Sequence, residues 1–206
     1  MANGGWGTLP RRLGDFLVDH RVALTLLAFL GMGLSSLALG ARPRDLARLH
    51  DPHVTTGLVL VLGGLSLRSW AAGTLRKGKG LTTVGPYRLC RHPLYLGSLA
   101  MMAGFCLLCR HVHAAGPVLV GVLGLYLLTM YREERRLAVR YGAAWEEYAR
   151  RTPRMLPRRL PACREAEWAW AQWFRSREYN ALGVSSLALA ALQSWHHLFA
   201  RLLAHQ

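Results

Sequence analysis

The sequence is poor in lysine and in acidic residues, although it is strongly basic. Its 206 residues include 26 lysines and arginines against 11 aspartates and glutamates, which gives a formal net charge of +15. Only Lys77 and Lys79 are lysines, so arginine supplies nearly all of the positive charge. Because the arginines flank apolar segments, the pattern favours contact with anionic lipid headgroups and argues against nucleic-acid binding.

Cysteine is also scarce, and its placement argues against several kinds of site. Four cysteines do not provide the disulfide framework of a small secreted domain. Cys106 and Cys109 have CxxC spacing, but Arg110 stands where a haem-attachment motif requires histidine. His111 and His113 follow, so a metal site is one alternative. We favour two thiols packed at the end of an apolar segment and expect no metal.

The sequence is rich in apolar segments near the length that crosses a membrane, for which about 20 residues are needed. Hydrophobic residues make up 52% of the chain. The candidate membrane segments are Val22–Gly40, Val54–Gly73, Leu94–Cys109, Pro117–Tyr131 and Ala181–Ala200. We therefore predict an all-α, polytopic membrane protein with about five transmembrane helices. A signal peptide is the alternative for the first segment, and the last is the least certain because it contains Gln193, His196 and His197.

Two further helices are expected outside these segments. Apolar and charged residues recur with helical spacing from Arg132 to Arg151, which predicts an amphipathic helix that is either separate from the fourth apolar segment or continuous with it. Gly142 is a weak point in this helix. Aromatic residues among arginines and glutamates favour an interfacial helix over Glu165–Tyr179. We divide the chain into an N-terminal part with two membrane helices (1–73), a central part with the polar motifs (74–160) and a C-terminal part (161–206).

Loop charges predict the orientation in the membrane. Five lysines or arginines between Thr74 and Pro93, and twelve arginines between Arg132 and Arg177, contrast with Arg110 alone in the intervening turn. The positive-inside rule places both arginine-rich regions on the cytoplasmic side. We expect an integral protein of a bacterial inner membrane whose polar motifs face the cytoplasm.

Two polar motifs adjoin the third and fourth apolar segments. The first is the loop Gly85–Gly97, which is stiffened by Pro86 and Pro93, and the second is Glu133–Glu134. If the two apolar segments form an antiparallel hairpin, the motifs lie close together in space. Ionisable residues gathered at one membrane face indicate a functional site.

An ordered series of short motifs spans roughly Leu65 to Pro157. Its members are Leu67–Ala71, Gly85–Tyr87, Arg91–Gly97, Glu133–Glu134 with Leu137, Tyr141–Gly142, Tyr148 and Pro153–Pro157. The series resembles the isoprenylcysteine carboxyl methyltransferase and phospholipid methyltransferase superfamily. That resemblance implies methyl transfer from S-adenosylmethionine at the cytoplasmic face, without a Rossmann domain. Accordingly, the sequence has no glycine-rich strand–turn–helix motif for a dinucleotide.

The resemblance implies that both polar motifs form the cofactor pocket. The expected cofactor-binding residues are Tyr87, Arg91, His92, Pro93, Tyr95, Gly97, Glu133, Glu134 and Tyr148. Arginine and histidine suit the cofactor carboxylate, glutamates suit its ammonium and ribose hydroxyls, and tyrosines suit its adenine or sulfonium.

Four residues are expected to act on the methyl acceptor. Arg154 is expected to hold a carboxylate acceptor through paired hydrogen bonds. An amine or thiol acceptor must lose a proton, and Glu134 is then the expected base. Trp145, which stands where the family more often has tyrosine, and Arg68 are expected to contact the substrate. Arg68, the one charge in its apolar segment, either reaches the interface or faces the site.

Two other functions remain open. One is a nicotinamide-dependent reductase on a related helical scaffold, although such proteins usually have a longer chain. The other is a non-catalytic membrane subunit or transport-related protein, in which the polar motifs contact headgroups. For a methyltransferase, we expect membrane lipid and a lipophilic substrate from the bilayer as partners. The sequence specifies neither the methyl acceptor nor the oligomeric state.

Overall fold

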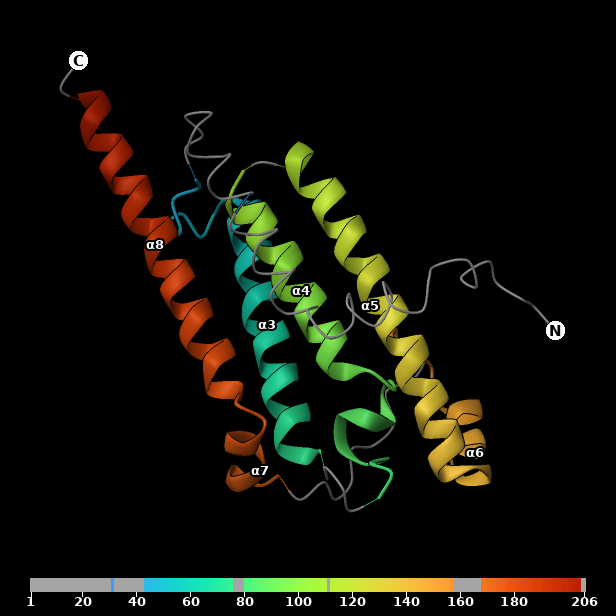
Figure 1. Ribbon diagram of the computed structural model, residues 1–206. Helices are drawn as coiled ribbons and strands as arrows, with labels where there is room; N and C mark the ends of the chain where they lie inside the picture. Colours follow the sequence, from blue (N-terminus) through green and yellow to red (C-terminus); the bar gives the residue numbers. More distant parts are fainter. Residues whose placement is uncertain (1–30, 32–42, 76–79, 111, 158–167, 205–206) are drawn as a thin grey trace.

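The computed structural model describes residue 31 and residues 43–75, 80–110, 112–157 and 168–204. Within these ranges the chain is helical, as predicted, and contains no strand. Four long helices lie side by side (Figure 1): α3 (Pro52–Thr74), α4 (Pro93–Leu108), α5 (Val112–Tyr141) and α8 (Glu178–Ala204). The first predicted membrane segment, Val22–Gly40, lies outside the described residues apart from Gly31.

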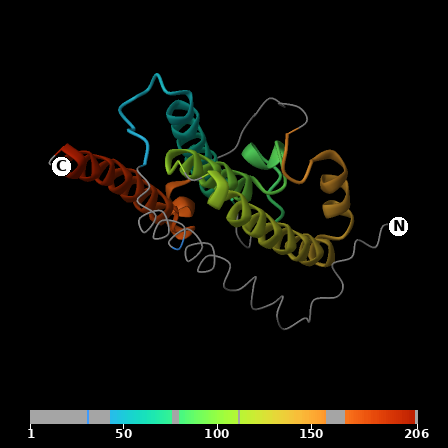
Figure 2. The same cartoon turned by 90° about the horizontal axis from the view of Figure 1, so that it is seen from above.

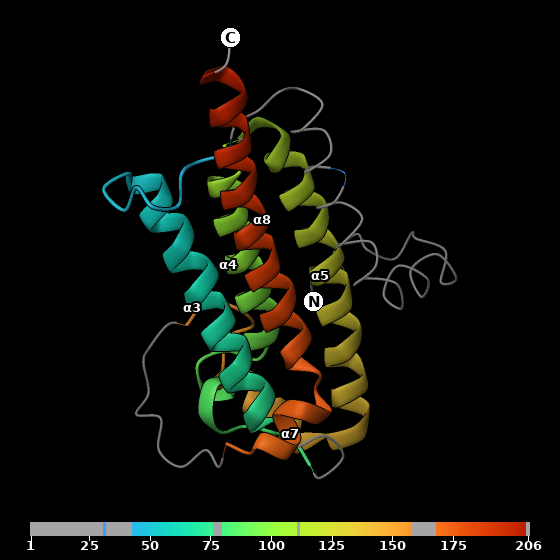
Figure 3. The same ribbon diagram turned by 90° about the vertical axis from the view of Figure 1, so that its left-hand side faces the viewer.

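Three short elements gather at one end of the long helices. They are η2 (Gly85–Arg88), α6 (Ala143–Arg151) and α7 (Trp170–Arg175). Figure 2 shows α6 beside the end of α5 and α7 on the side of α3. Figure 3 shows α8 crossing in front of α4, between α3 and α5. The first polar motif, Gly85–Gly97, which we call the motif loop, therefore begins at the end of the long helices that carries these short elements.

Helix α3 has the length and composition of a membrane helix. Asp51 caps its first turn by accepting a hydrogen bond from the His53 backbone N–H at 2.9 Å, and Pro52 occupies a position that needs no N–H. The predicted segment Val54–Gly73 lies within α3, and Leu94–Cys109 matches α4 within one residue at each end. Among the described residues, α3 is the one helix long and apolar enough to cross a membrane. Helix α4 is apolar but has 16 residues.

Helices α3 and α4 touch through glycines that face each other. A Cβ atom at Gly64 would lie 2.5 Å from the Gly97 carbonyl oxygen, and one at Gly104 would lie 2.6 Å from the Gly57 carbonyl oxygen. The backbones can approach this closely only because these positions carry no side chain. The contact fixes the start of α4, and with it the motif loop, against α3.

Helix α5 joins the fourth predicted segment to the first half of the amphipathic helix, which was one of the two alternatives, and it begins before Pro117. The expected segment started at Pro117, but the helix starts at Val112 and Pro117 lies inside it. It continues to Tyr141, because the arginines, glutamates and leucine after its apolar part are strong helix formers. Gly142, with a φ of 51°, then ends the helix. The predicted amphipathic helix Arg132–Arg151 is therefore wrong as a single helix, since its two halves belong to α5 and α6.

The C-terminal part also differs from the prediction. In place of one helix over Glu165–Tyr179, the described residues form the short helix α7 and the first residues of α8. Arg177 lies between them with a φ of 54°, in the left-handed region that interrupts a helix. The predicted segment Ala181–Ala200 lies within α8. The break at Arg177 allows the start of α8 to approach α3.

Polar residues in α8 attach it to the loop before α3. Gln193 accepts a hydrogen bond from the Leu46 backbone N–H at 2.8 Å and donates one to Asp45 at 3.0 Å. His196 Nδ1 lies 2.9 Å from the Pro43 carbonyl oxygen. These polar side chains made the segment an uncertain membrane helix, and the structure gives them partners. Helix α8 is thus held at the end opposite the motif loop.

Candidate functional site

The hairpin of α4 and α5 brings the two polar motifs into contact. His92, just before α4, lies with Nε2 3.1 Å from Oε1 of Glu134, although 42 positions separate them in the sequence. Tyr95, in the first turn of α4, donates a hydrogen bond to Glu133 at 2.9 Å. The structure therefore contains the juxtaposition that the hairpin predicted.

Glu134 is the centre of a cluster of ion pairs. Arg91 Nη1 lies 3.0 Å from its Oε1, and Arg154 donates to both carboxylate oxygens, at 3.0 and 2.6 Å. Burial favours a higher pKa for Glu134, but hydrogen bonds from His92 and Arg154 and the charge of Arg91 hold the pKa at about 2. With three partners converging on one carboxylate, the geometry favours an anchoring role for Glu134, and the expected base role stays a prediction.

The segment after α6 braces the motif loop. The backbone N–H groups of Arg91 and His92 donate to the carbonyl oxygens of Pro153 at 2.9 Å and Arg154 at 3.2 Å. Arg154 thus contacts the loop through its carbonyl oxygen and binds Glu134 through its side chain. Nε and Nη2 of this guanidinium are thus already engaged by a carboxylate of the protein, and the expected contact of Arg154 with an acceptor carboxylate stays a prediction.

Helix α6 packs against the loop from the other side. Tyr148 donates a hydrogen bond to the Tyr87 carbonyl oxygen at 2.7 Å. Burial raises the pKa of Tyr148, so its hydroxyl remains a donor at neutral pH. Trp145 is buried beside Tyr148, and the Arg91 guanidinium lies 5.8 Å from the centre of its indole ring. Trp145 therefore contacts the Arg91 guanidinium with its indole ring and helps to hold it in place.

A cavity of about 470 Å³, which we call the inner cavity, lies between the motif loop and helices α3, α4, α5 and α8. It is lined by Arg68, Ala72, Leu75, Tyr87, Arg91, His92, Pro93, Leu94, Tyr95, Ser98, Tyr126, Glu133, Leu137, Ser176 and Glu178. The hydroxyl of Tyr87 and Nε of Arg91 are buried with no hydrogen-bond partner within the described part of the chain. Buried polar atoms are nearly always paired, and both residues line the inner cavity.

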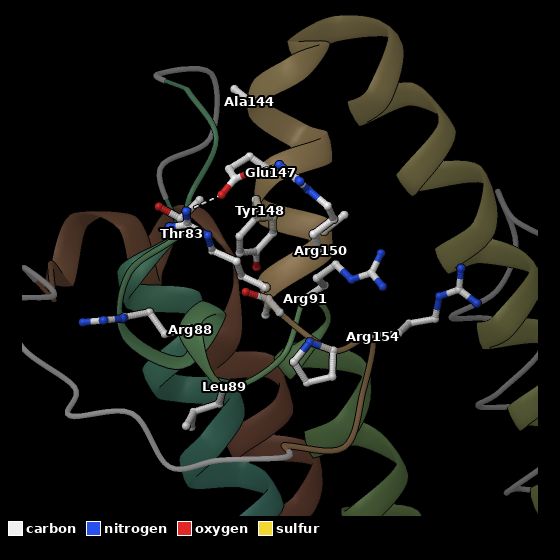
Figure 4. Close-up of a pocket in the computed structure, with 13 residues that line it drawn as sticks. Thr83, Arg88, Leu89, Arg91, Ala144, Glu147, Tyr148, Arg150 and Arg154 are labelled. Atoms are coloured by element: carbon white, nitrogen blue, oxygen red, sulfur yellow. Dashed lines mark hydrogen bonds and ion pairs between the residues drawn. The ribbon is translucent and has the colours of Figure 1, made fainter.

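A wider pocket of about 1090 Å³, the outer pocket, lies between the motif loop and α6 (Figure 4). Its lining residues are Thr83, Arg88, Leu89, Arg91, Ala144, Glu147, Tyr148, Ala149, Arg150, Arg151, Thr152, Pro153 and Arg154. Glu147, on α6, is paired with Arg150 and Arg151. Arg91 lines both spaces and therefore lies between them.

Most of the expected cofactor-binding residues line the inner cavity. These residues are Tyr87, Arg91, His92, Pro93, Tyr95 and Glu133. Glu134 and Trp145 line neither space, whereas Tyr148 and Arg154 line the outer pocket. Gly97 also lies apart, because a Cβ atom there would lie 2.6 Å from the Gly64 carbonyl oxygen. Its lack of a side chain serves the contact between α3 and α4, so the structure gives Gly97 a packing role, and the expected cofactor contact stays a prediction.

Arg68 faces the inner cavity, which decides between its two expected positions. Its guanidinium is paired with Glu178, at 2.7 Å from Nε to Oε1 and 3.0 Å from Nη2 to Oε2. The sequence interpretation missed Glu178, Ser98 and Tyr126, which also line the cavity. The charge of Arg68 within an apolar helix could have indicated that an acidic partner such as Glu178 exists, because a buried cation needs a partner.

Comparisons with known proteins agree with the motifs. A family model described as phospholipid methyltransferase matches residues 52–144. The cobalt-zinc-cadmium resistance protein CzcN of Cupriavidus metallidurans is 31% identical over 164 residues, which are 78% of this chain and 74% of that protein. The nickel-cobalt-cadmium resistance protein NccN of Alcaligenes xylosoxydans xylosoxydans is 30% identical over 155 residues, or 72% and 70% of the two chains.

A shorter similarity extends to another class of enzyme. The Delta(14)-sterol reductase of Mus musculus is 37% identical over 84 residues, which are 39% of this chain and 20% of the reductase. No solved structure matches the chain significantly. The family model covers both polar motifs and the hairpin that joins them. Together with the similarity to the two resistance proteins over more than two thirds of each, this shows that the chain belongs to the phospholipid methyltransferase family.

Proposed function

We propose that this protein transfers a methyl group from S-adenosylmethionine to a lipophilic acceptor at the cytoplasmic face of a bacterial inner membrane. The observation that carries the proposal is the inner cavity, where the two polar motifs meet beside two unpartnered polar atoms of the described chain. Membership of the family supports methyl transfer as the chemistry and S-adenosylmethionine as the donor.

The lining of the inner cavity fits the polar groups of S-adenosylmethionine. Glu133 suits the ammonium group and the ribose hydroxyls, while Arg91 and His92 suit the carboxylate. Tyr87 and Tyr95 offer aromatic surface to the adenine or the sulfonium. When bound, the cofactor supplies a methyl group activated by a positively charged sulfur. The cavity volume of about 470 Å³ lies within the range of small-molecule sites.

In this reaction the protein mainly positions the acceptor against the methyl group and excludes water from the site. Methyl transfer is an in-line displacement, so the acceptor must be aligned in a dry site. The ion pairs of Glu134 with Arg91 and Arg154 hold the wall of the site rigid. Glu133 lines the cavity whereas Glu134 does not, so Glu133 is the glutamate that we assign to the cofactor.

In the proposed membrane arrangement, α3, α4, α5 and α8 cross the bilayer. The end that carries η2, α6 and α7 faces the cytoplasm. The apolar helix α3 and the arginine-rich loops support this arrangement. Membrane lipid and the lipophilic acceptor are the proposed partners. Arg68 and Glu178 also line the cavity, so we include them with the central part (74–160) in the proposed catalytic unit.

Two observations keep other functions as alternatives. The similarity to a sterol reductase favours a nicotinamide-dependent reductase as the second candidate. The names of the two resistance proteins favour a non-catalytic membrane component of a metal-resistance system as the third. The three functions differ in what the inner cavity binds: a sulfonium methyl donor, a reduced dinucleotide, or neither.

Equilibrium binding to the purified protein tests these functions directly. We expect saturable binding of radiolabelled S-adenosylmethionine to the wild type, and binding at least about tenfold weaker in Glu133→Gln and Tyr95→Phe, because each substitution removes a polar contact of the cavity. Glu146→Gln, an exposed change on α6 with the same change in charge, should bind like the wild type. Saturable binding of NADPH without the methyl donor would favour the reductase, and binding of neither would favour the non-catalytic component.

A further inference from the structure

We propose that Glu178 is a specificity-determining residue. By neutralising Arg68, it makes the inner end of the cavity uncharged and excludes acceptors that end in a carboxylate there. This inference rests on the proposed function, because it assumes that the acceptor reaches the inner cavity. The family model ends before α8, so this residue belongs to a part of the chain that the family motifs do not cover.

Helical spacing places Arg68 at the end of the cavity farthest from the motif loop. On α3, Arg68 lies one turn before Ala72 and about two turns before Leu75, all three of which line the cavity. On α4, Ser98 lies one turn beyond Leu94, away from the loop. Tyr126, on α5, lies two turns before Glu133. Arg68, Ser98 and Tyr126 therefore form the inner end, and Glu178 joins them from α8.

Every nitrogen of the Arg68 guanidinium already has an acceptor within the protein. Nε and Nη2 bind the two carboxylate oxygens of Glu178, and Nη1 donates to the Ser98 hydroxyl. Glu178 is only 3% exposed. A bidentate pair of this kind fills the fork with which arginine recognises carboxylates. A ligand at the inner end therefore meets a neutral pair and not a free cation.

The position of Glu178 is fixed by the docking of α7 on α3. The indole N–H groups of Trp168 and Trp173 donate to the carbonyl oxygen and the hydroxyl of Ser69, at 3.1 and 3.3 Å. The backbone N–H of Ala169 donates to the Gly73 carbonyl oxygen at 3.0 Å. Displacement of Glu178 by a ligand would have to leave its carboxylate buried without Arg68, which is costly.

The other arginine of the inner cavity is also engaged by a carboxylate. Arg91 is paired with Glu134, and its unpartnered Nε lies at the motif-loop end, where we place the cofactor. An acceptor carboxylate at the inner end would be buried beside Glu178 and repelled by it. The inner end thus suits an uncharged polar group that can hydrogen-bond with Ser98 or Tyr126.

The test measures ligand binding without the methyl donor, so it does not depend on methyl transfer. Tritiated decanoate and decanol are equilibrated with the full-length protein in nanodiscs, and uptake by empty nanodiscs is subtracted. We expect the wild type to bind decanol at least about tenfold more tightly than decanoate. Glu178→Gln should bind decanoate about tenfold more tightly than the wild type, because Arg68 is released, while decanol binding stays within about twofold.

The double variant Arg68→Gln with Glu178→Gln separates this effect from a general loosening of the site. It should lose the gain in decanoate binding, whereas exposed Glu146→Gln should bind both probes like the wild type. Equal binding of the two probes by the wild type, no gain in Glu178→Gln, a gain that survives in the double variant, or no binding of either probe above empty nanodiscs would each overturn the proposal. The wild-type comparison holds even if Glu178→Gln does not fold. Binding of S-adenosylmethionine, measured separately, reports on the proposed function itself.

Discussion

Replacing Glu134 with glutamine should lower the free energy of unfolding by about 3 kcal/mol and reduce S-adenosylmethionine binding at least about tenfold. The reason is that Arg91, His92 and Arg154 all converge on this one carboxylate, and the neutral amide leaves positive charges facing one another. Removing one partner of a buried ion pair typically costs about 3–5 kcal/mol of stability, and we take the lower end of this range because the Arg154 side chain is 45% exposed. Chemical denaturation in detergent, followed by tryptophan fluorescence, measures the stability, and equilibrium binding measures the cofactor.

The pH dependence provides a signature specific to this cluster. The pKa of Glu134 is about 2 in the folded protein against 4.5 for a free glutamate, so its ionisation stabilises the fold fully above pH 4.5. That contribution should disappear as the pH falls from 4.5 towards 2. The difference in stability between the wild type and Glu134→Gln should therefore shrink over the same interval. A difference that stays constant with pH would show that the ion pairs are not its source.

Substituting alanine at Gly64 and at the adjacent Gly63 should change stability in opposite directions. A Cβ atom at Gly64 would lie 2.5 Å from the Gly97 carbonyl oxygen and 2.9 Å from the Met101 backbone nitrogen, whereas one at Gly63 meets nothing within 4 Å. Gly64→Ala must push α3 and α4 apart, and we expect it to cost about 1–3 kcal/mol or more. Gly63→Ala should gain up to about 1 kcal/mol from helix propensity.

The displacement of α4 by Gly64→Ala should also change the inner cavity, because α4 carries Tyr95 and begins directly after His92. Gly64→Ala should therefore weaken S-adenosylmethionine binding, and Gly63→Ala should not. Thermal unfolding monitored by circular dichroism and the same binding assay provide both readouts. If the two variants behave alike, the glycine contact does not set the spacing of α3 and α4.

The meeting of His92 with Glu134 could be predicted from the sequence because it depends only on local rules. Two apolar segments joined by a short turn pack as an antiparallel hairpin, so the residue before one adjoins the residue after the other. The start and the end of α5 were harder to predict from the sequence. Pro117 was interpreted as a helix start, yet the helix accommodates it in its second turn. Gly142 was recognised as a weak point, but only the backbone shows that it ends the helix.

The partners of the arginines could not be predicted for a different reason. Arg68 and Glu178 are 110 positions apart, and their pairing depends on how the tryptophans around α7 dock on Ser69. Arg154 was expected to hold a substrate because arginine suits carboxylates, and the same chemistry directs it to Glu134. Sequence patterns identify which side chains seek a carboxylate. Long-range packing decides whether that carboxylate belongs to the protein or to a ligand.

Helix α8 is attached at two points, by Glu178 to Arg68 near one end and by Gln193 to the Asp45–Leu46 loop towards the other. The rotation of the helix about its axis and its position along the axis are therefore both set. Inserting one residue between these points would turn one attachment about 100° away from its partner. Only one of them could then form, so the number of residues between Glu178 and Gln193 is itself a constraint on which sequences this fold accepts.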